Sequence, residues 1–346
     1  MKILVTGGYG FIGSNFIKYT LKNTEYSIIN VDKITYAARP QSLKEVNSDP
    51  RYEFVKADIC DTSTMKNLIE DVDYVINFAA ETHVDRSIGT WESKQTTEER
   101  WKQSGENSFI KTNILGTQSL LEAVKSSKIK KFIQISTDEV YGPVEKPSKE
   151  TDPFNPRNPY AATKAAAECL AIAYFHTFKI PICITRSCNN YGPWQGSEKF
   201  IPVTILSALA NTPIPIYGTG KNIRDWIFVE DNTAAILAIL EKGTPGKFYN
   251  IPGENLRTNI ELAKLILKLM GKSEKLIRFV KDRPGHDLKY AMDGAKLHSE
   301  CGWKPKYTLE QGLKIAIDFY KEHEKEFRKD QKRSGVLERI KGLLRE

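Results

Sequence analysis

The sequence predicts an α/β protein built on a doubly wound parallel sheet with a smaller C-terminal α/β lobe. Short β-branched runs alternate with helical patterns through the first half of the chain. A glycine-rich stretch directly follows the first of these runs. The length of 346 residues also exceeds what one hydrophobic core usually holds. Alternation of this kind requires right-handed crossovers and a sheet that is covered on both faces.

Five runs are the expected strands of this sheet: residues 3–6, 27–31, 53–56, 74–78 and 132–136. Three longer segments carry the helical period: residues 12–21, 112–124 and 160–178. A further strand and helix at 224–231 and 233–240 are expected to return to the sheet.

The composition of the sequence changes near residue 187, where proline and glycine become more frequent. We therefore expect a cofactor-binding domain over 1–186, to which 224–245 returns. The smaller lobe is expected to comprise 187–223 and 246–322. Residues 323–346 form a basic tail with apolar residues at helical spacing.

Composition limits the class of protein. There are 51 Lys and Arg against 43 Asp and Glu, an excess of 8 that suits nucleic acid, a membrane surface or an anionic metabolite. No run of about 18 apolar residues exists, so no membrane span is expected. The five cysteines are odd in number and lack metal-type spacing, which predicts reduced thiols, a cytoplasmic location and no metal site.

The glycine-rich stretch Gly7-Gly8-Tyr9-Gly10-Phe11-Ile12-Gly13 lies between the first strand and the first helix. Glycines there let the backbone approach a pyrophosphate, and the helix N-terminus meets its charge. Asp32 ends the second strand about 20 residues later, where it can accept hydrogen bonds from an adenosine ribose. Because its carboxylate would repel a 2′-phosphate, NAD is favoured over NADP, although Lys33 weakens that preference.

Tyr160 and Lys164 stand four residues apart and therefore share one helix face. A nearby cation lowers the pKa of a phenol, so Tyr160 can act as general base on a sugar hydroxyl. Thr137, Asp138 and Glu139 follow the fifth strand, at the sheet edge where ligands bind. Adjacent carboxylates push one pKa upward, which supplies one proton donor and one acceptor.

The glycine loop together with Tyr160 and Lys164 resembles the extended short-chain dehydrogenase/reductase superfamily, whose sheet is of the Rossmann type. Within it, the run Ser136-Thr137-Asp138-Glu139-Val140-Tyr141-Gly142 resembles the nucleotide-sugar 4,6-dehydratases, in particular those that act on dTDP-glucose. Matching stretches from the first strand to about residue 320 include 79–88, 189–193, 223–231 and 282–287.

The resemblance implies a mechanism. Tyr160 takes the proton of the sugar C4 hydroxyl while hydride passes from C4 to NAD, and Lys164 lowers the Tyr160 pKa and holds the nicotinamide ribose. Glu139 then removes the C5 proton, Asp138 protonates the leaving C6 hydroxyl, and Thr137 hydrogen-bonds the C4 oxygen. Hydride returns to C6 and yields the 4-keto-6-deoxy sugar used in deoxysugar biosynthesis.

The resemblance also implies two sets of binding residues. The cofactor set adds residues around the glycine loop and the next strand ends: Gly7, Gly10, Phe11, Ile12, Gly13, Asp32, Lys33, Asp58, Ile59, Ala79, Ala80, Tyr160 and Lys164. The set for the nucleotide sugar, which includes guanidinium groups for its diphosphate, comprises Thr82, Asn189, Lys199, Pro215, Tyr217, Arg224, Asn250, Arg283 and Tyr290.

Two segments depart from the family pattern. Residues 89–108 form an insertion of roughly fifteen residues, either a solvated loop or a flap near the sugar. The tail either packs on its own protein, frays, or touches a membrane surface or another subunit.

Alternative functions stay open at this point. They are an epimerase or decarboxylase on the same scaffold, a dehydratase for a UDP-, CDP- or GDP-linked hexose, and a non-catalytic NAD-binding regulator. No nucleic-acid partner is expected. The helices at 112–124 and 160–178 resemble a dimer interface of the superfamily, so we expect a homodimer.

Overall fold

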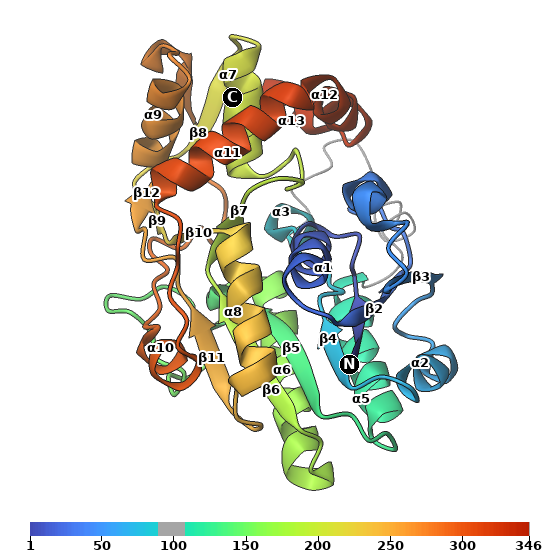
Figure 1. The fold of residues 1–346 in the computed structure, drawn as a ribbon. Coiled ribbons are helices and arrows are strands. Elements are labelled where there is room, and N and C mark those ends of the chain that lie inside the picture. Colours follow the sequence, from blue (N-terminus) through green and yellow to red (C-terminus); the bar gives the residue numbers. More distant parts are fainter. Residues whose placement is uncertain (89–107, 346) are drawn as a thin grey trace, which may run out of the picture.

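Seven parallel strands form the main sheet in the order β11-β6-β5-β4-β1-β2-β3 (Figure 1). A computed structural model describes residues 1–88 and 108–345, so the insertion predicted at 89–108 lies outside the described residues except for Ser108. The strands are β1 (Lys2–Thr6), β2 (Ser27–Asp32), β3 (Tyr52–Lys56), β4 (Tyr74–Asn77), β5 (Lys131–Thr137), β6 (Ile182–Ser187) and β11 (Phe248–Ile251). The first six follow the order of doubly wound dinucleotide-binding sheets, which confirms the predicted fold class.

Side-chain alternation along the strands creates two cores. Ile3 and Val5 of β1 point into one core, whereas Leu4 points into the other, and all three are fully buried. Helices α1 (Phe11–Asn23) and α8 (Val229–Lys242) cover the first face. Helices α2 (Thr62–Ile69), α5 (Thr117–Val124) and α6 (Pro159–Phe178) cover the second (Figure 1).

Most predicted elements of the first half are confirmed to within one or two residues, with one difference in form. The helix expected over 112–124 begins as a π-helical segment at Ile110–Gly116 and becomes α-helical only in α5. Such wide turns are rare and often lie at functional sites. Here Thr112 of this segment reaches the main pocket.

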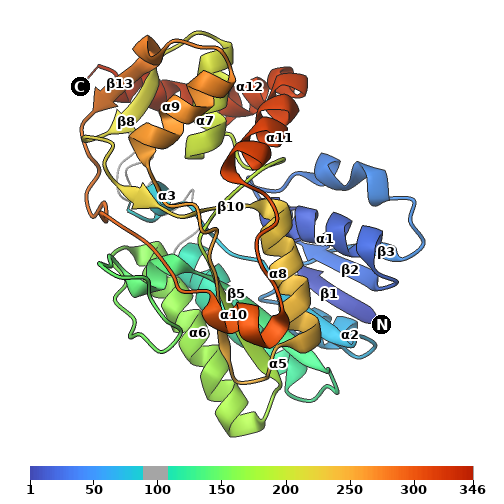
Figure 2. The same cartoon turned by 60° about the vertical axis from the view of Figure 1, so that its left-hand side comes forward.

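A third core, separate from the sheet, holds the smaller lobe together (Figure 2). It is built on α7 (Phe200–Leu209), α9 (Asn259–Leu269) and α11 (Leu309–Glu322). Three two-stranded sheets border it: β7 (Asn189–Tyr191) with β10 (Trp226–Phe228), β8 (Ile214–Tyr217) with β13 (Ile277–Val280), and β9 (Ile223–Arg224) with β12 (Arg257–Thr258). Short helices occur at Pro40–Val46, Val84–Ser87 (α3), Asp138–Tyr141, Glu274–Leu276 and Ala295–Cys301 (α10).

The chain crosses between the two parts more often than the sequence indicates. The strand expected at 224–231 does not join the main sheet, because β10 pairs with β7, while α8 does pack against that sheet. The edge position next to β6 is taken instead by β11, which lies inside the range expected for the smaller lobe. The exact division into two domains therefore stays a prediction.

The tail folds back onto the protein as α12 (Glu324–Arg333) and α13 (Val336–Leu343). Phe327 is fully buried in the core of the smaller lobe. Asp330 pairs with Arg39 at 2.7 Å and accepts a hydrogen bond from Ser197, so it connects the tail to both parts of the molecule. None of the described helices is both long and apolar enough to cross a membrane.

Candidate active site

The glycine loop is shaped for close approach of a ligand. Gly7 has a φ of +68°, and a Cβ there would lie 2.7 Å from the Ala79 Cα atom. A Cβ on Gly13 would lie 2.5 Å from the Gly7 carbonyl oxygen. Helix α1 begins after Gly10 without a side-chain cap, and the residues of its first turn line the same pocket as these glycines. These features fit the pyrophosphate of a dinucleotide.

Asp32, the last residue of β2, contacts the backbone of the glycine loop. Its carboxylate accepts hydrogen bonds from the Tyr9 N–H at 3.0 Å and the Ile34 N–H at 2.7 Å. A carboxylate has about four acceptor positions, so capacity remains for a ribose diol. The Lys33 ammonium lies 3.7 Å from the Asp58 carboxylate and forms an ion pair with it at the edge of the pocket.

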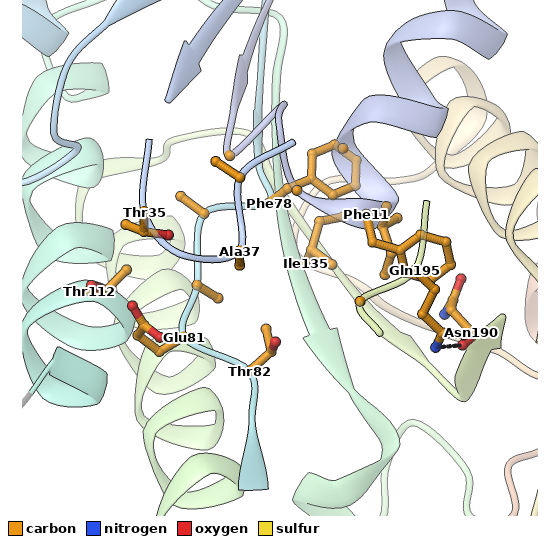
Figure 3. Close-up of a pocket in the computed structure, with 18 of the residues that line it drawn as sticks. Phe11, Thr35, Ala37, Phe78, Glu81, Thr82, Thr112, Ile135, Asn190 and Gln195 are labelled. Atoms are coloured by element: carbon orange, nitrogen blue, oxygen red, sulfur yellow. Dashed lines mark hydrogen bonds between the residues drawn. The ribbon is translucent and has the colours of Figure 1, made fainter. Parts of the chain in front are cut away.

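One pocket brings together most of the predicted cofactor residues and all five predicted catalytic residues. Its lining includes the glycine loop, Asp32, Lys33, Ile59, Ala79, Ala80, Thr137, Asp138, Glu139, Tyr160 and Lys164, whereas Asp58 lies just outside. Figure 3 shows Phe11, Ile135, Asn190 and Gln195 on one side of it and Thr35, Glu81, Thr82 and Thr112 on the other. The loop and Asp32 fit a dinucleotide, and these residues are the ones predicted to hold NAD.

The carboxyl pair lies in the turn that follows β5. Thr137 caps this turn, accepting from the Glu139 N–H and donating to Asp138 at 3.2 Å. Burial, together with the neighbouring Glu139 charge, raises the pKa of Asp138 from its ordinary 3.8 to about 8. Glu139 is held by the Asn158 amide, which donates to it at 2.9 Å. The pair thus combines a protonated acid near neutral pH with a second, oriented carboxylate.

Tyr160 and Lys164 share one face of α6, and both are buried. The Lys164 ammonium donates to the Ile135 carbonyl at 2.6 Å, and burial lowers its pKa to about 8. We expected Lys164 to lower the pKa of Tyr160. Instead, burial and the Glu139 charge raise the Tyr160 pKa, because the carboxyl pair lies close to the phenol.

A buried ion pair lies one helical turn after Lys164 and acts on its charge. Glu168 stands one turn after Lys164, and its carboxylate pairs with Arg186 at 2.7 Å. Both side chains are almost fully buried. The Glu168 charge favours the ammonium form of Lys164 and partly offsets the effect of burial on its pKa.

The predicted residues for the nucleotide sugar separate into three groups. Thr82, Asn189 and Lys199 line the main pocket. Arg224 lies over the Tyr290 ring at 4.3 Å, and the charges of Glu139 and Asp138 act on it, which places it beside the carboxyl pair. Tyr217 and Arg283 are connected through Arg339 and Asp85, and none of these four residues lines the main pocket. Pro215 lies two residues before Tyr217 in β8.

Asn250 stands apart from the other predicted substrate residues. Its side chain is fully buried, accepts from the Tyr141 hydroxyl at 2.8 Å and donates to the Ser148 carbonyl at 2.9 Å. It does not line the pocket, so its geometry supports a structural role.

Several residues were not predicted: Asn158, which lies next to the pocket and contacts Glu139, and three residues that line the pocket. Asn158 both caps α6, through the Ala161 N–H, and holds Glu139. Its place before Pro159 is a helix-start signal that could have indicated the capping role. Trp194, Asp330 and Ser334 line the pocket, and no local motif marks them. Within the described ranges, no group of three or more His, Cys, Asp or Glu side chains could hold a metal ion.

Comparison with known proteins identifies the family of the chain. The family described as GDP-mannose 4,6 dehydratase matches residues 4–316. A dTDP-glucose 4,6-dehydratase of Haemophilus influenzae is 44% identical over 345 residues, covering 92% of this chain and 98% of the relative. The chain belongs to this dehydratase family.

Solved structures of the dehydratase family agree with the fold. The dTDP-glucose 4,6-dehydratase of Bacillus anthracis, in complex with NAD, has a TM-score of 0.84 and 41% identity, covering 94% of this chain and 98% of that one. A double mutant of the dTDP-glucose 4,6-dehydratase DesIV from Streptomyces venezuelae, also with NAD bound, has a TM-score of 0.88 and 37% identity. The coverage is 95% of this chain and 100% of that one.

Proposed function

We propose that this protein is an NAD-dependent hydro-lyase that dehydrates dTDP-glucose to the 4-keto-6-deoxy sugar. The observation that carries this proposal is the position of the buried Asp138 beside Glu139, in one pocket with Tyr160, Lys164 and the glycine loop. The 44% identity to a dTDP-glucose 4,6-dehydratase over most of the chain supports both the reaction and the substrate.

Each side chain has a proton task in this proposal. Tyr160 takes the proton of the C4 hydroxyl, and Thr137 hydrogen-bonds the C4 oxygen. Glu139 takes the C5 proton, which the neighbouring carbonyl acidifies. Asp138 gives its proton to the C6 hydroxyl, which leaves as water. NAD, when bound, supplies reversible hydride acceptance, and Lys164 orients its nicotinamide ribose.

The raised pKa of Tyr160 opposes this task, because only the phenolate can accept a proton and burial and the Glu139 charge disfavour that form. Its ionisation needs the positive charge of Lys164, whose pKa of about 8 keeps most ammonium groups protonated at neutral pH.

The alternatives make different demands on the site. An epimerase or a decarboxylase on this scaffold uses Tyr160 and Lys164 but does not need Asp138 together with Glu139. Burying Asp138 next to a second carboxyl group, that of the half-buried Glu139, opposes folding. The presence of this costly pair in the pocket supports elimination over these reactions and over a non-catalytic role.

Incubation with a panel of dTDP-, UDP-, CDP- and GDP-linked hexoses tests the proposal. We expect loss of one water from dTDP-glucose, measured by mass spectrometry, and a 4-keto product. Asp138→Asn and Glu139→Gln should retain NAD but lose most product formation. Wild-type turnover in both variants would refute the elimination roles.

We further propose a homodimer that uses the helical segments 112–124 and 160–178. Exposed apolar side chains beside them support this proposal, among them Leu115 at 51% and Ile110 at 44% exposure. Light scattering of the purified chain measures its mass directly.

A cytoplasmic location is proposed from the five cysteines, all of which are free thiols.

A further inference from the structure

Helix α13 lies outside the matched family segment yet reaches the side of the molecule where the nucleotide is expected. The family match ends at residue 316, whereas α13 spans Val336–Leu343. Figure 2 shows the C-terminus beside β8 and β13. The contact is specific, because the Arg339 guanidinium donates to the hydroxyl of Tyr217, the last residue of β8.

The same guanidinium forms an ion pair with Asp85 of α3. The other oxygen of Asp85 pairs with Arg283 at 3.1 Å. The three side chains are largely shielded from solvent, with exposures of 17% for Arg339, 7% for Asp85 and 23% for Arg283. Arg339 therefore connects two predicted nucleotide-binding residues, Tyr217 and Arg283, that come from different chain segments.

The charges of this cluster show what Arg339 does. Asp85 alone would neutralise Arg283 and draw it away from an anionic ligand. With Arg339 present, two guanidinium groups share the Asp85 carboxylate, so Asp85 is not held by Arg283 alone. Burial raises the pKa of Asp85, but the charges of Arg339 and Arg283 outweigh that effect and lower it, so the carboxylate stays ionised.

The surroundings of the cluster are cationic as well. Burial and the charges of Lys199, Arg339, Arg86 and Arg283 lower the pKa of His83 well below its ordinary value. Two of these cations, Lys199 and Arg283, are predicted substrate residues. A region where several cations converge on a neutral imidazole suits a ligand with a diphosphate.

We propose that Arg339 is a positioning residue of the nucleotide site, holding Asp85 and Tyr217 so that Arg283 and Tyr217 meet a nucleoside diphosphate. This inference rests on the proposed function. Arg339 acts through its neighbours, and it does not line the pocket that holds the carboxyl pair.

The test measures binding of dTDP to the full-length protein with NAD bound, by titration calorimetry, together with kcat and KM for dTDP-glucose. For Arg339→Gln we expect dTDP affinity to fall about tenfold and KM to rise in parallel, the usual effect of losing one charge-assisted contact. The kcat should change little, because the carboxyl pair and Tyr160 are untouched.

Two further variants separate positioning from mere stability. Lys341→Gln removes the same charge from the same helix, at an ammonium that is 60% exposed and pairs with Glu338, and it should behave as wild type. Arg339→Lys keeps the charge but lacks the planar fork that serves two partners, so it should recover only part of the affinity. Equal dTDP affinity in Arg339→Gln and Lys341→Gln would overturn the inference. So would a loss of kcat and melting temperature at unchanged KM.

The outcomes also distinguish this inference from the proposed function. If the wild type neither binds dTDP nor releases water from dTDP-glucose, the proposed function fails and the inference fails with it. If the wild type does both and Arg339→Gln is indistinguishable from it, only the inference fails.

Discussion

Replacing Asp138 with Asn should remove catalysis and at the same time remove a cost to folding that depends on pH. Asp138 is 4% exposed, and burial with the Glu139 charge raises its pKa to about 8. The folded protein therefore keeps a proton that the unfolded chain releases near pH 3.8. Stability from this group is fully present below pH 3.8 and declines as the pH rises towards 8.

The expected magnitude follows from that window. Between pH 5 and pH 7 the folded state binds about one more proton at this site than the unfolded state does. Each pH unit then costs about 1.4 kcal/mol, so the wild type loses about 3 kcal/mol from Asp138 over the interval. An amide does not titrate, so the free energy of unfolding of Asp138→Asn should gain about 3 kcal/mol relative to wild type between these two pH values.

Urea unfolding of both proteins at pH 5 and pH 7 measures this difference. A constant packing effect of the amide cancels, because only the change with pH is compared. Asp318→Asn is the matched control, since that side chain is 76% exposed, and it should leave the pH dependence unchanged. Parallel pH curves for wild type and Asp138→Asn would refute the burial argument. Product formation by Asp138→Asn should fall by about 10²–10⁴-fold.

Three further predictions concern the cofactor pocket and its support. Gly13→Ala should lose most co-purified NAD, measured spectrophotometrically after denaturation, because its Cβ would collide with the Gly7 carbonyl; full NAD content would count against the close approach. Glu168→Gln should lower the free energy of unfolding by about 3–5 kcal/mol in urea, since Arg186 would be left as a buried unpaired charge. Asp330→Asn should release NAD faster in a stopped-flow competition experiment because it loosens a wall of the pocket, and an unchanged rate would show that the tail does not retain the cofactor.

Local patterns accounted for much of the fold. The strand periodicity placed β1 to β5 to within a residue or so because a strand buried on both faces needs a short apolar run whatever surrounds it. The strand expected after residue 224 shows where this reasoning ends. Its sequence is strand-like, but the partner of a strand depends on which sheet edge the rest of the chain leaves available, and β11 takes that edge.

Local spacing likewise indicated the catalytic side chains, since a four-residue separation puts Tyr160 and Lys164 on one helix face in any helix. The direction of the Tyr160 pKa could not be read in this way. The direction of this pKa shift depends on burial of the phenol and on the charge of Glu139, which lies in the short helix Asp138–Tyr141 before α6.

By itself, the sequence determined the doubly wound sheet and the glycine loop with Asp32, and it predicted the roles that we propose for the Thr137–Glu139 and Tyr160–Lys164 motifs. Only the tertiary structure decided the protonation of Asp138, the internal role of Asn250, and the contact of Arg339 with Asp85 across 254 residues. The physical reason is the distance along the chain over which each interaction acts. Helix spacing and backbone freedom act between near neighbours, whereas burial and charge depend on all the segments that fold around a group.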